Sequence, residues 1–262
     1  MNISNSKDTS SLLNKAQSAQ QTQLQRISSA KQINSAKDDA AGLVIATKLD
    51  SQSLSITAAL KNNMDGISHI QVEDGALASV SEDLQKIREL SLQQQNGTLN
   101  EEGRQAIQSE IDQRLESIDT VLGQTEFNGK NVFEDAQVNI QAGTEAGQTI
   151  DIGGEDIAAQ FSALGVAADD GEINLTSLDS ALELVSQRRS ELGASESRLE
   201  SNSEFLALKN EQNQSASSRI QDTDFAKALA EKSKADIQVS VIIGVQAQAN
   251  QNQESVLRLL KS

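Results

Sequence analysis

Residues 33–42 of the chain read Ile33-Asn34-Ser35-Ala36-Lys37-Asp38-Asp39-Ala40-Ala41-Gly42. Asn34 and Ser35 are residue types that cap helix N-termini, and two adjacent carboxylates favour a helix start. Gly42 allows two segments to meet at an angle or to pack closely. Because the sequence on both sides is amphipathic, this stretch predicts a connector between two helices.

A thin apolar stripe precedes the connector. In residues 8–33 apolar or small side chains recur every three or four positions, at Leu12, Ala16, Ala19, Ile27, Ala30 and Ile33, with Gln23 filling the step between Ala19 and Ile27. This spacing predicts a helix with one narrow apolar face. Because alanine stands where a self-sufficient helix has leucine, such a helix is marginal alone and forms when it docks on a partner. Packing against its own domain is the alternative.

Two longer segments carry heptad repeats. Residues 44–95 have apolar residues seven apart, at Leu49, Ile56, Ile70, Leu77 and Leu84, with Asn63 at the missing step. After Thr176, a helix cap in this interpretation, the same spacing holds at Leu178, Val185, Leu192, Leu199, Leu206 and Ile220, interrupted by Asn213. A sustained heptad indicates a coiled-coil or bundle seam.

The region between these helices changes character. Thr98 to Glu101 fits a capping box, with Thr98 as the cap of a helix that ends at Gly123. Residues 137–141 and 149–152 then alternate polar and apolar side chains, which predicts two short strands in a hairpin.

The C-terminal segment resembles the first thirty residues in type, being amphipathic and rich in Ala and Gln. The helices with narrow apolar stripes lie at the two ends of the chain, and the helices with heptad repeats lie between them on either side of the β insert. This order suggests that both ends pair. We therefore expect a mainly α fold of long antiparallel helices in a coiled coil or bundle, with a small β-hairpin region at about 125–170. Residues 1–42 and 224–262 form one predicted domain, and residues 43–223 form the other.

Composition favours elongated helices over a globular enzyme. The 262 residues are 37% hydrophobic and 2% aromatic, with no proline and no cysteine. Disulfides and thiolate metal sites are excluded. A net charge of −16 disfavours nonspecific binding to nucleic acid or an anionic membrane. No apolar run approaches the ~20 residues of a membrane span, and the N-terminus lacks the features of a secretory signal peptide.

Catalytic chemistry finds little support in the sequence. The single histidine, His69, lies within a long predicted helix, where a surface position is favoured over a general base. No His-Glu-x-x-His motif is present, and we expect no catalytic residue, no metal site and no cofactor.

Several blocks at both ends resemble one protein family. Residues 24–42, 63–68, 73–77, 84–90 and 123–129 are similar to the N-terminal signature of bacterial flagellins, and residues 218–226 and 247–251 to the C-terminal signature. The resemblance covers roughly residues 1–150 and 175–262, in the right order. The chain lacks room for large outer domains. Ala30 departs from the family, which commonly has glycine there.

The resemblance implies a structural subunit that self-polymerises into the flagellar filament for swimming motility. In the family the terminal helices form the inner coiled-coil tube, and the helices with heptad repeats form a surrounding layer. We expect the filament self-assembly contacts at Leu12, Ala16, Ala19, Ile27, Ile33, Ile237, Val241, Val245, Ala249, Val256, Leu259 and Leu260. The joint between terminal and core domains falls at Asn34, Ser35, Lys37, Asp38, Asp39 and Gly42.

The resemblance also implies partners and a location. Family members leave the cell through the flagellar type III export channel without signal cleavage and become extracellular filaments. Their partners are further copies, an export chaperone at the C-terminal end, the filament cap and the hook-associated junction proteins. A host Toll-like flagellin receptor contacts relatives at the positions of Gln85, Lys86, Leu90, Glu110, Gln113 and Arg114. Lysine at position 86 replaces an arginine of strongly recognised relatives and predicts weaker recognition.

Two other functions compete with the filament subunit. The hook–filament junction protein shares the terminal helices, although the block from Ser35 to Gly42 and the Gln-Ala-Asn-Gln sequence near the C-terminus fit a flagellin better. A cytoplasmic coiled-coil adaptor is the third interpretation. It differs by forming a fixed oligomer with dispensable ends.

Overall fold

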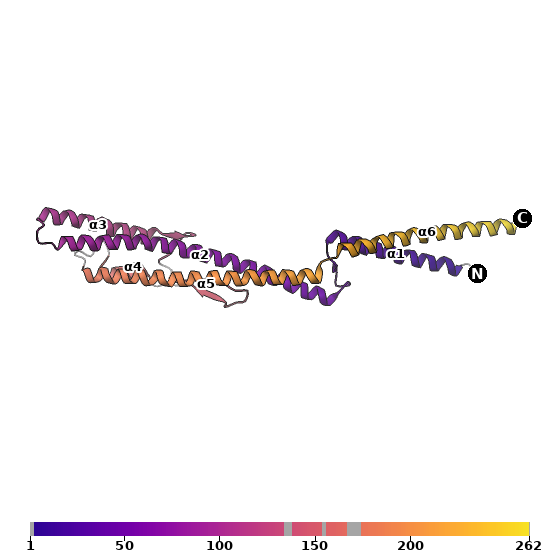
Figure 1. The fold of residues 1–262 in the computed structure, drawn as a ribbon, viewed down its shortest axis with the longest axis horizontal. Coiled ribbons are helices and arrows are strands. Elements are labelled where there is room, and N and C mark those ends of the chain that lie inside the picture. The colour runs from indigo at the N-terminus through magenta and orange to yellow at the C-terminus, as the bar shows by residue number, and fades with distance from the viewer. Residues whose placement is uncertain (1–2, 134–137, 154–155, 167–173, 262) are drawn as a thin grey trace. The chain divides into compact units, whose positions relative to one another are not determined.

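The computed structural model describes residues 3–133, 138–153, 156–166 and 174–261. Figure 1 shows these residues as long helices with small β hairpins, which confirms the predicted fold class. The elements are α1 (Ile3–Ser29), α2 (Ala40–Gln94), α3 (Glu101–Gln124), β1 (Glu126–Phe127), β2 (Lys130–Asn131), β3 (Asn139–Gln141), β4 (Thr149–Asp151), α4 (Ile157–Ala163), α5 (Leu175–Gln221) and α6 (Phe225–Lys261).

The chain divides into two compact units. One comprises Met1–Ser53 with Glu211–Ser262, and the other comprises Leu54–Asn210. We call them the terminal unit and the core unit; α2 and α5 contribute to both. The predicted domain boundaries after residues 42 and 223 stay a prediction, because compactness does not reveal the role of a segment in an assembly.

Two heptad seams build the core unit. The α2 positions Ile56, Ile70, Leu77 and Leu84 and the α5 positions Leu178, Val185, Leu192, Leu199 and Leu206 are at most 3% exposed. Gln71 Nε2 donates to Glu196 Oε1 at 3.0 Å and Arg88 Nε to Asp179 Oδ1 at 2.7 Å, so α2 and α5 run antiparallel. The heptad prediction is confirmed along this unit.

A polar layer interrupts the seam at Asn63. This side chain is fully buried, and its Nδ2 donates to Ser203 Oγ at 3.1 Å. A buried asparagine in a coiled-coil seam fixes the register at some cost in stability, because another register separates its Nδ2 from the Ser203 hydroxyl. The gap in the apolar pattern therefore specifies the pairing of α2 with α5.

Two antiparallel hairpins follow α3. In the first, Phe127 pairs with Lys130 around Asn128 and Gly129, both with positive φ. In the second, which the sequence predicts, β3 pairs with β4 and Ile140 lies opposite Ile150. Asn62 of α2 and Asn202 of α5 donate to the carbonyls of Gln141 and Ala142 at 3.1 and 2.6 Å. The hairpin is thus tied to both long helices.

The predicted helix caps at Thr98 and Thr176 are wrong by two residues each. Asn100 caps α3, where its Oδ1 accepts from Gly103 N at 2.9 Å. Asn174 Oδ1 accepts from Thr176 N at 3.0 Å at the start of α5. Each stretch holds two residue types that can cap, and asparagine is at least as good a cap as threonine.

The surface position predicted for His69 is also wrong. His69 is 9% exposed, and its imidazole meets the Phe127 ring edge-on, with centroids 5.4 Å apart. The first hairpin brings Phe127 over this face of α2. Since that contact joins residues far apart in sequence, helical periodicity alone does not predict it.

Candidate assembly interface

The two terminal helices pair in antiparallel fashion. Gln20 Nε2 donates to Asp236 Oδ1 at 2.6 Å, and Gln23 Nε2 donates to Glu231 Oε2 at 2.8 Å. Figure 1 shows α1 and α6 side by side in the terminal unit. Hydrogen bonds from Lys232 and then from Gln20 hold the pKa of Asp236 below its ordinary value. Polar contacts therefore add to the narrow apolar stripes and fix the register of α1 against α6.

A groove of about 520 Å³ lies between these helices. It brings together five of the predicted assembly residues with three further side chains. The lining residues are Leu12, Lys15, Ala16, Ala19, Ile237, Gln238, Val241 and Ile242. Ala16 is 6% exposed and sits at the pairing face, whereas Leu12 is 54% exposed. Small residues on α1 therefore bring the helices together without filling the space between them.

The apolar surface of α6 extends around more than one face. Ile237, Val241, Ile243 and Val245 are all between 51% and 64% exposed. A cluster of exposed large apolar side chains of this kind marks a surface that contacts another protein. Among the described residues, α1 packs against α6 and leaves these four side chains more than half exposed.

The other predicted assembly residues occupy mixed environments. Ile27 and Ala249 are half-buried. Ile33 is 5% exposed, and its Cδ1 would lie 2.7 Å from a Cβ at position 42, so it belongs to the connector. Val256, Leu259 and Leu260 lie in α6, but their side chains fall outside the described part. The sequence interpretation missed Ile243, although the run from Val239 to Val245 signals it.

The connector is built around two carboxylates with different roles. Asp38 Oδ2 accepts from the backbone N–H of Asn34 and Ser35 and from the Ser35 hydroxyl, at 3.0–3.1 Å. Hydrogen bonding by the Asn34 N–H, then by the Ser35 hydroxyl, lowers the pKa of Asp38. Asp39 caps α2, since its Oδ1 accepts from Gly42 N at 2.9 Å. The predicted caps at Asn34 and Ser35 are wrong, because the turn that Asp38 organises delays the helix start.

The backbone at Gly42 is closely approached by two side chains. A Cβ there would collide with the Asp39 carboxylate and with Ile33. The predicted close packing at Gly42 is therefore confirmed. Lys37 lies in the same turn and is exposed.

The end of α1 contacts the end of α5 through backbone hydrogen bonds. Gln32 N donates to Gln221 O at 2.6 Å, and Thr223 N donates to Ala30 O at 3.0 Å. Ala30 adopts φ +58°, a left-handed conformation that favours glycine. The departure from the flagellin pattern at Ala30 thus falls on a position where an L side chain is strained.

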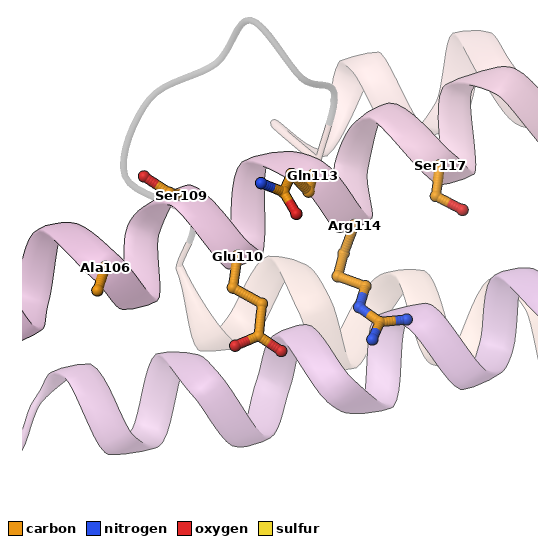
Figure 2. A pocket seen from close by; sticks show the side chains of 6 residues that line it. All are labelled: Ala106, Ser109, Glu110, Gln113, Arg114 and Ser117. Atoms are coloured by element: carbon orange, nitrogen blue, oxygen red, sulfur yellow. The ribbon is translucent and has the colours of Figure 1, made fainter.

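A polar surface lies on α3 in the core unit. Figure 2 shows Glu110 and Arg114 extending toward α2, with Ser109 and Gln113 nearby. Arg114 Nη1 lies 2.9 Å from Asp83 Oδ1, which fixes the guanidinium. These residues line a shallow depression of about 510 Å³. Three predicted receptor-contact residues, Glu110, Gln113 and Arg114, share this surface.

The remaining predicted receptor-contact residues lie on α2. Gln85 is exposed, and Lys86 Nζ contacts Glu89 Oε2 at 2.8 Å. Leu90, in contrast, is 4% exposed within the apolar core. A direct contact through the Leu90 side chain is therefore not available in this conformation.

A buried ion pair joins three elements of the core unit and escaped the sequence interpretation. Arg188 Nε donates to Glu73 Oε1 at 2.7 Å, and Arg188 Nη2 donates to Ile152 O at 2.9 Å. Burial raises the pKa of Glu73 despite the opposing effect of Arg188. Arg188 thus fastens the end of β4 to α2. Neither residue breaks the heptad pattern, so the sequence carries no signal for this pair.

The described side chains show no grouping of three or more His, Cys, Asp or Glu residues suited to a metal ion. Across the described helices, no stretch combines the length and apolar character that a membrane crossing needs.

Comparison with known proteins gives one consistent family. The model of the bacterial flagellin N-terminal helical region matches residues 2–138, and that of the C-terminal helical region matches residues 175–260. A flagellin of Halalkalibacterium halodurans is 37% identical over 259 residues, covering 95% of this chain and 93% of that protein. A flagellin of Bacillus subtilis (strain 168) is 34% identical, covering 97% of each chain. Such coverage indicates a short form without a large outer domain.

Two further similarities agree. A flagellar filament 30.7 kDa core protein of Treponema maltophilum is 31% identical, with 92% of each chain covered. The crystal structure of Bacillus cereus flagellin matches with a TM-score of 0.51 at 26% identity, covering 56% of this chain and 88% of that one. The chain therefore belongs to the bacterial flagellin family, whose members are structural subunits of the flagellar filament and not enzymes.

Proposed function

We propose that this chain polymerises through its paired terminal helices into a helical filament that serves swimming motility. The observation that supports this most directly is the apolar surface of α6, where Ile237, Val241, Ile243 and Val245 stay more than half exposed beside α1. Fully burying such a side chain stabilises by about 1.5–3 kcal/mol, so covering the exposed half of each contributes on the order of 1 kcal/mol. Further copies of the chain supply that cover.

The weakness of α1 fits the same proposal. Its pairing face uses Ala16 and Ala19 and leaves Leu12 exposed at the groove. Helix formation is cooperative and depends on tertiary packing for most of its stability. Ordering of the ends and addition to the filament are therefore coupled, and contacts that repeat without closing a ring generate a helical polymer.

We assign residues 1–42 and 224–262 to the inner layer of the filament and residues 43–223 to the surrounding layer. The assembly contacts are the apolar residues of α1 and α6. The connector from Asn34 to Gly42 joins the layers, and its hydrogen-bonded turn at Asp38 fixes how the chain leaves α1 and enters α2.

Export and partners belong to the proposal as well. The subunit passes through the flagellar type III channel without cleavage and becomes extracellular. An export chaperone covers the apolar surface of α6 before assembly, since an uncovered patch of this kind promotes aggregation. The filament cap and the hook-associated junction proteins meet the same terminal helices. A host Toll-like receptor contacts Gln85, Lys86, Glu110, Gln113 and Arg114.

Truncation provides the first test. Removing residues 1–33 or residues 225–262 should leave a folded core unit that fails to elongate filament seeds, as seen by negative-stain microscopy and sedimentation. Growth of either truncated chain on seeds would exclude the assembly role of the ends.

A point substitution separates assembly from folding. Ile243 is 51% exposed and does not line the groove between α1 and α6. Ile243→Asp should therefore preserve the helical circular dichroism of the single chain but prevent elongation, because filament burial leaves the new charge without a partner. The matched control, Ile243→Leu, keeps the apolar area and should elongate seeds. Normal filaments from Ile243→Asp would show that this face of α6 stays solvent-exposed.

A further inference from the structure

The loop between α2 and α3 contains an asparagine followed by glycine. Asn96 and Gly97 are both exposed, and a Cβ built at Gly97 would meet nothing within 4 Å. Within the described residues, the Gly97 N–H donates to no protein acceptor. The backbone nitrogen that follows the Asn96 side chain is thus open to solvent and unhindered.

The side chain of Asn96 is held by two hydrogen bonds. Its Oδ1 accepts from Thr98 N at 3.2 Å and from Thr98 Oγ1 at 3.0 Å. These contacts fold the carboxamide back along the peptide that follows it. Two donors on one carbonyl oxygen also stabilise negative charge that develops there, as in sites of acyl transfer. The carboxamide carbon therefore becomes more susceptible to a nearby nucleophile.

We propose that Asn96 is a site of spontaneous deamidation that the fold promotes. The Gly97 nitrogen attacks Asn96 Cγ, a new N–Cγ bond forms, and the Cγ–Nδ2 bond breaks. The proton from Gly97 leaves with Nδ2 as ammonia, and a cyclic imide remains. Water then adds to one of its two carbonyls. Attack at Cγ breaks the new N–Cγ bond and gives aspartate, whereas attack at the backbone carbonyl breaks the original C–N peptide bond and gives isoaspartate, with the chain continuing through Cγ.

The second Asn-Gly pair provides an internal comparison. Asn128 and Gly129 form the turn of the first hairpin, with φ +54° and +76°, and Phe127 pairs with Lys130 across it. Ring closure at Asn128 requires the backbone to leave this turn, which breaks the strand pairing. The same dipeptide is therefore reactive at residue 96 and protected at residue 128 while the chain is folded.

The products change the start of α3. Either product adds a negative charge four residues before the Asn100 cap, and isoaspartate also lengthens the backbone. The longer backbone disturbs the hydrogen bonds from Asn96 N to Gln93 O and from Leu99 N to Asn96 O. We expect the isoaspartate form to loosen the loop and the first turn of α3, where Glu101 and Glu102 already carry charge.

The experiment follows deamidation in the full-length chain. The protein is incubated at mildly alkaline pH, digested, and analysed by peptide mass spectrometry, with isoaspartate detected by enzymatic methylation. In the folded chain Asn96 should react at least about tenfold faster than Asn128, a difference of about 1.4 kcal/mol in activation free energy. In urea the two rates should converge, because the turn no longer protects Asn128.

Two variants isolate the cause. Gly97→Ala fits without a clash and should slow the reaction at Asn96 by about tenfold, since a side chain hinders the attacking nitrogen. Thr98→Val removes the hydroxyl donor and should slow it severalfold. Equal rates at Asn96 and Asn128 in the folded chain, or an unchanged rate in Gly97→Ala, would overturn the proposal. An unchanged or faster rate in Thr98→Val would overturn the role given to Thr98.

Discussion

Replacement of Leu192 by alanine offers a quantitative test of the core unit. Leu192 lies on the heptad seam of α5 and is 1% exposed, within an apolar cluster that includes Leu77, Leu84 and Val185. Removal of its isobutyl group leaves a cavity that the two long antiparallel helices cannot close by a local shift. The free energy of unfolding should therefore fall by both the lost transfer energy and the cost of the cavity.

The expected magnitude follows from this burial. Leucine-to-alanine changes at fully buried sites cost about 2–5 kcal/mol. For a domain of 150–250 residues, 1 kcal/mol corresponds to about 2–4 °C in melting temperature, so a loss of 3 kcal/mol lowers the midpoint by about 6–12 °C. Thermal unfolding followed by circular dichroism measures this shift directly.

Leu208 provides a matched control on the same helix. It is 61% exposed, so Leu208→Ala should change the free energy of unfolding by no more than about 0.5 kcal/mol. If Leu192→Ala leaves the midpoint unchanged, or if Leu208→Ala lowers it equally, the assignment of the buried seam is refuted.

Three further predictions concern the terminal unit and the buried ion pair. Ala30→Gly should stabilise the end of α1 by about 0.5–1 kcal/mol, because relief of the left-handed strain, about 1–2 kcal/mol, exceeds the added entropy of the unfolded chain. Hydrogen exchange at the Thr223 amide should therefore slow about two- to fivefold. Faster exchange would contradict this prediction. The pKa of Asp236 is lower in the folded chain than its ordinary value near 3.8. Asp236 therefore stabilises the helix pair fully when the pH is above that ordinary value, and this stabilisation is lost as the pH falls through the lower, folded-state pKa. The stability of the helix pair should consequently depend less on acid pH in Asp236→Asn than in the wild type. The pKa of Glu73 is raised in the fold, so its effect on stability has the opposite pH dependence. The wild-type core should gain stability relative to Glu73→Gln as the pH falls from neutrality. Melting temperatures that change equally with pH in the two proteins would refute this prediction.

The fold could be predicted from the sequence in the segments where one periodicity dominates. The seams of α2 and α5 follow from seven-residue spacing, because a narrow apolar stripe on a long helix has few ways to be buried. The exact starts of α2, α3 and α5 were not accessible. Each lies in a stretch with several capping residues, and the choice among them depends on turns such as the one Asp38 forms.

The candidate interface could be predicted only in part, for a different reason. Ala16, Ala19, Ile237 and Val241, which the stripes predict as filament contacts, line one groove between α1 and α6, and their role in the filament stays a prediction. Contacts between distant segments leave no periodic trace, so neither the Glu73–Arg188 pair nor the burial of His69 could be predicted.

The structure separates the residues that hold the subunit together from those we assign to assembly. In the core unit, the seam residues are buried within one molecule, and the Glu73–Arg188 ion pair also forms within one molecule. In the terminal unit, four large apolar side chains of α6 stay more than half exposed. A chain with a net charge of −16 tolerates such a patch in solution, because repulsion opposes close approach of copies until salt screens it. Leu192→Ala should therefore lower the melting temperature while filaments still form, whereas Ile243→Asp should leave the melting temperature unchanged and stop filament growth. If Ile243→Asp lowered the melting temperature as much as Leu192→Ala does, folding and assembly would share their contacts.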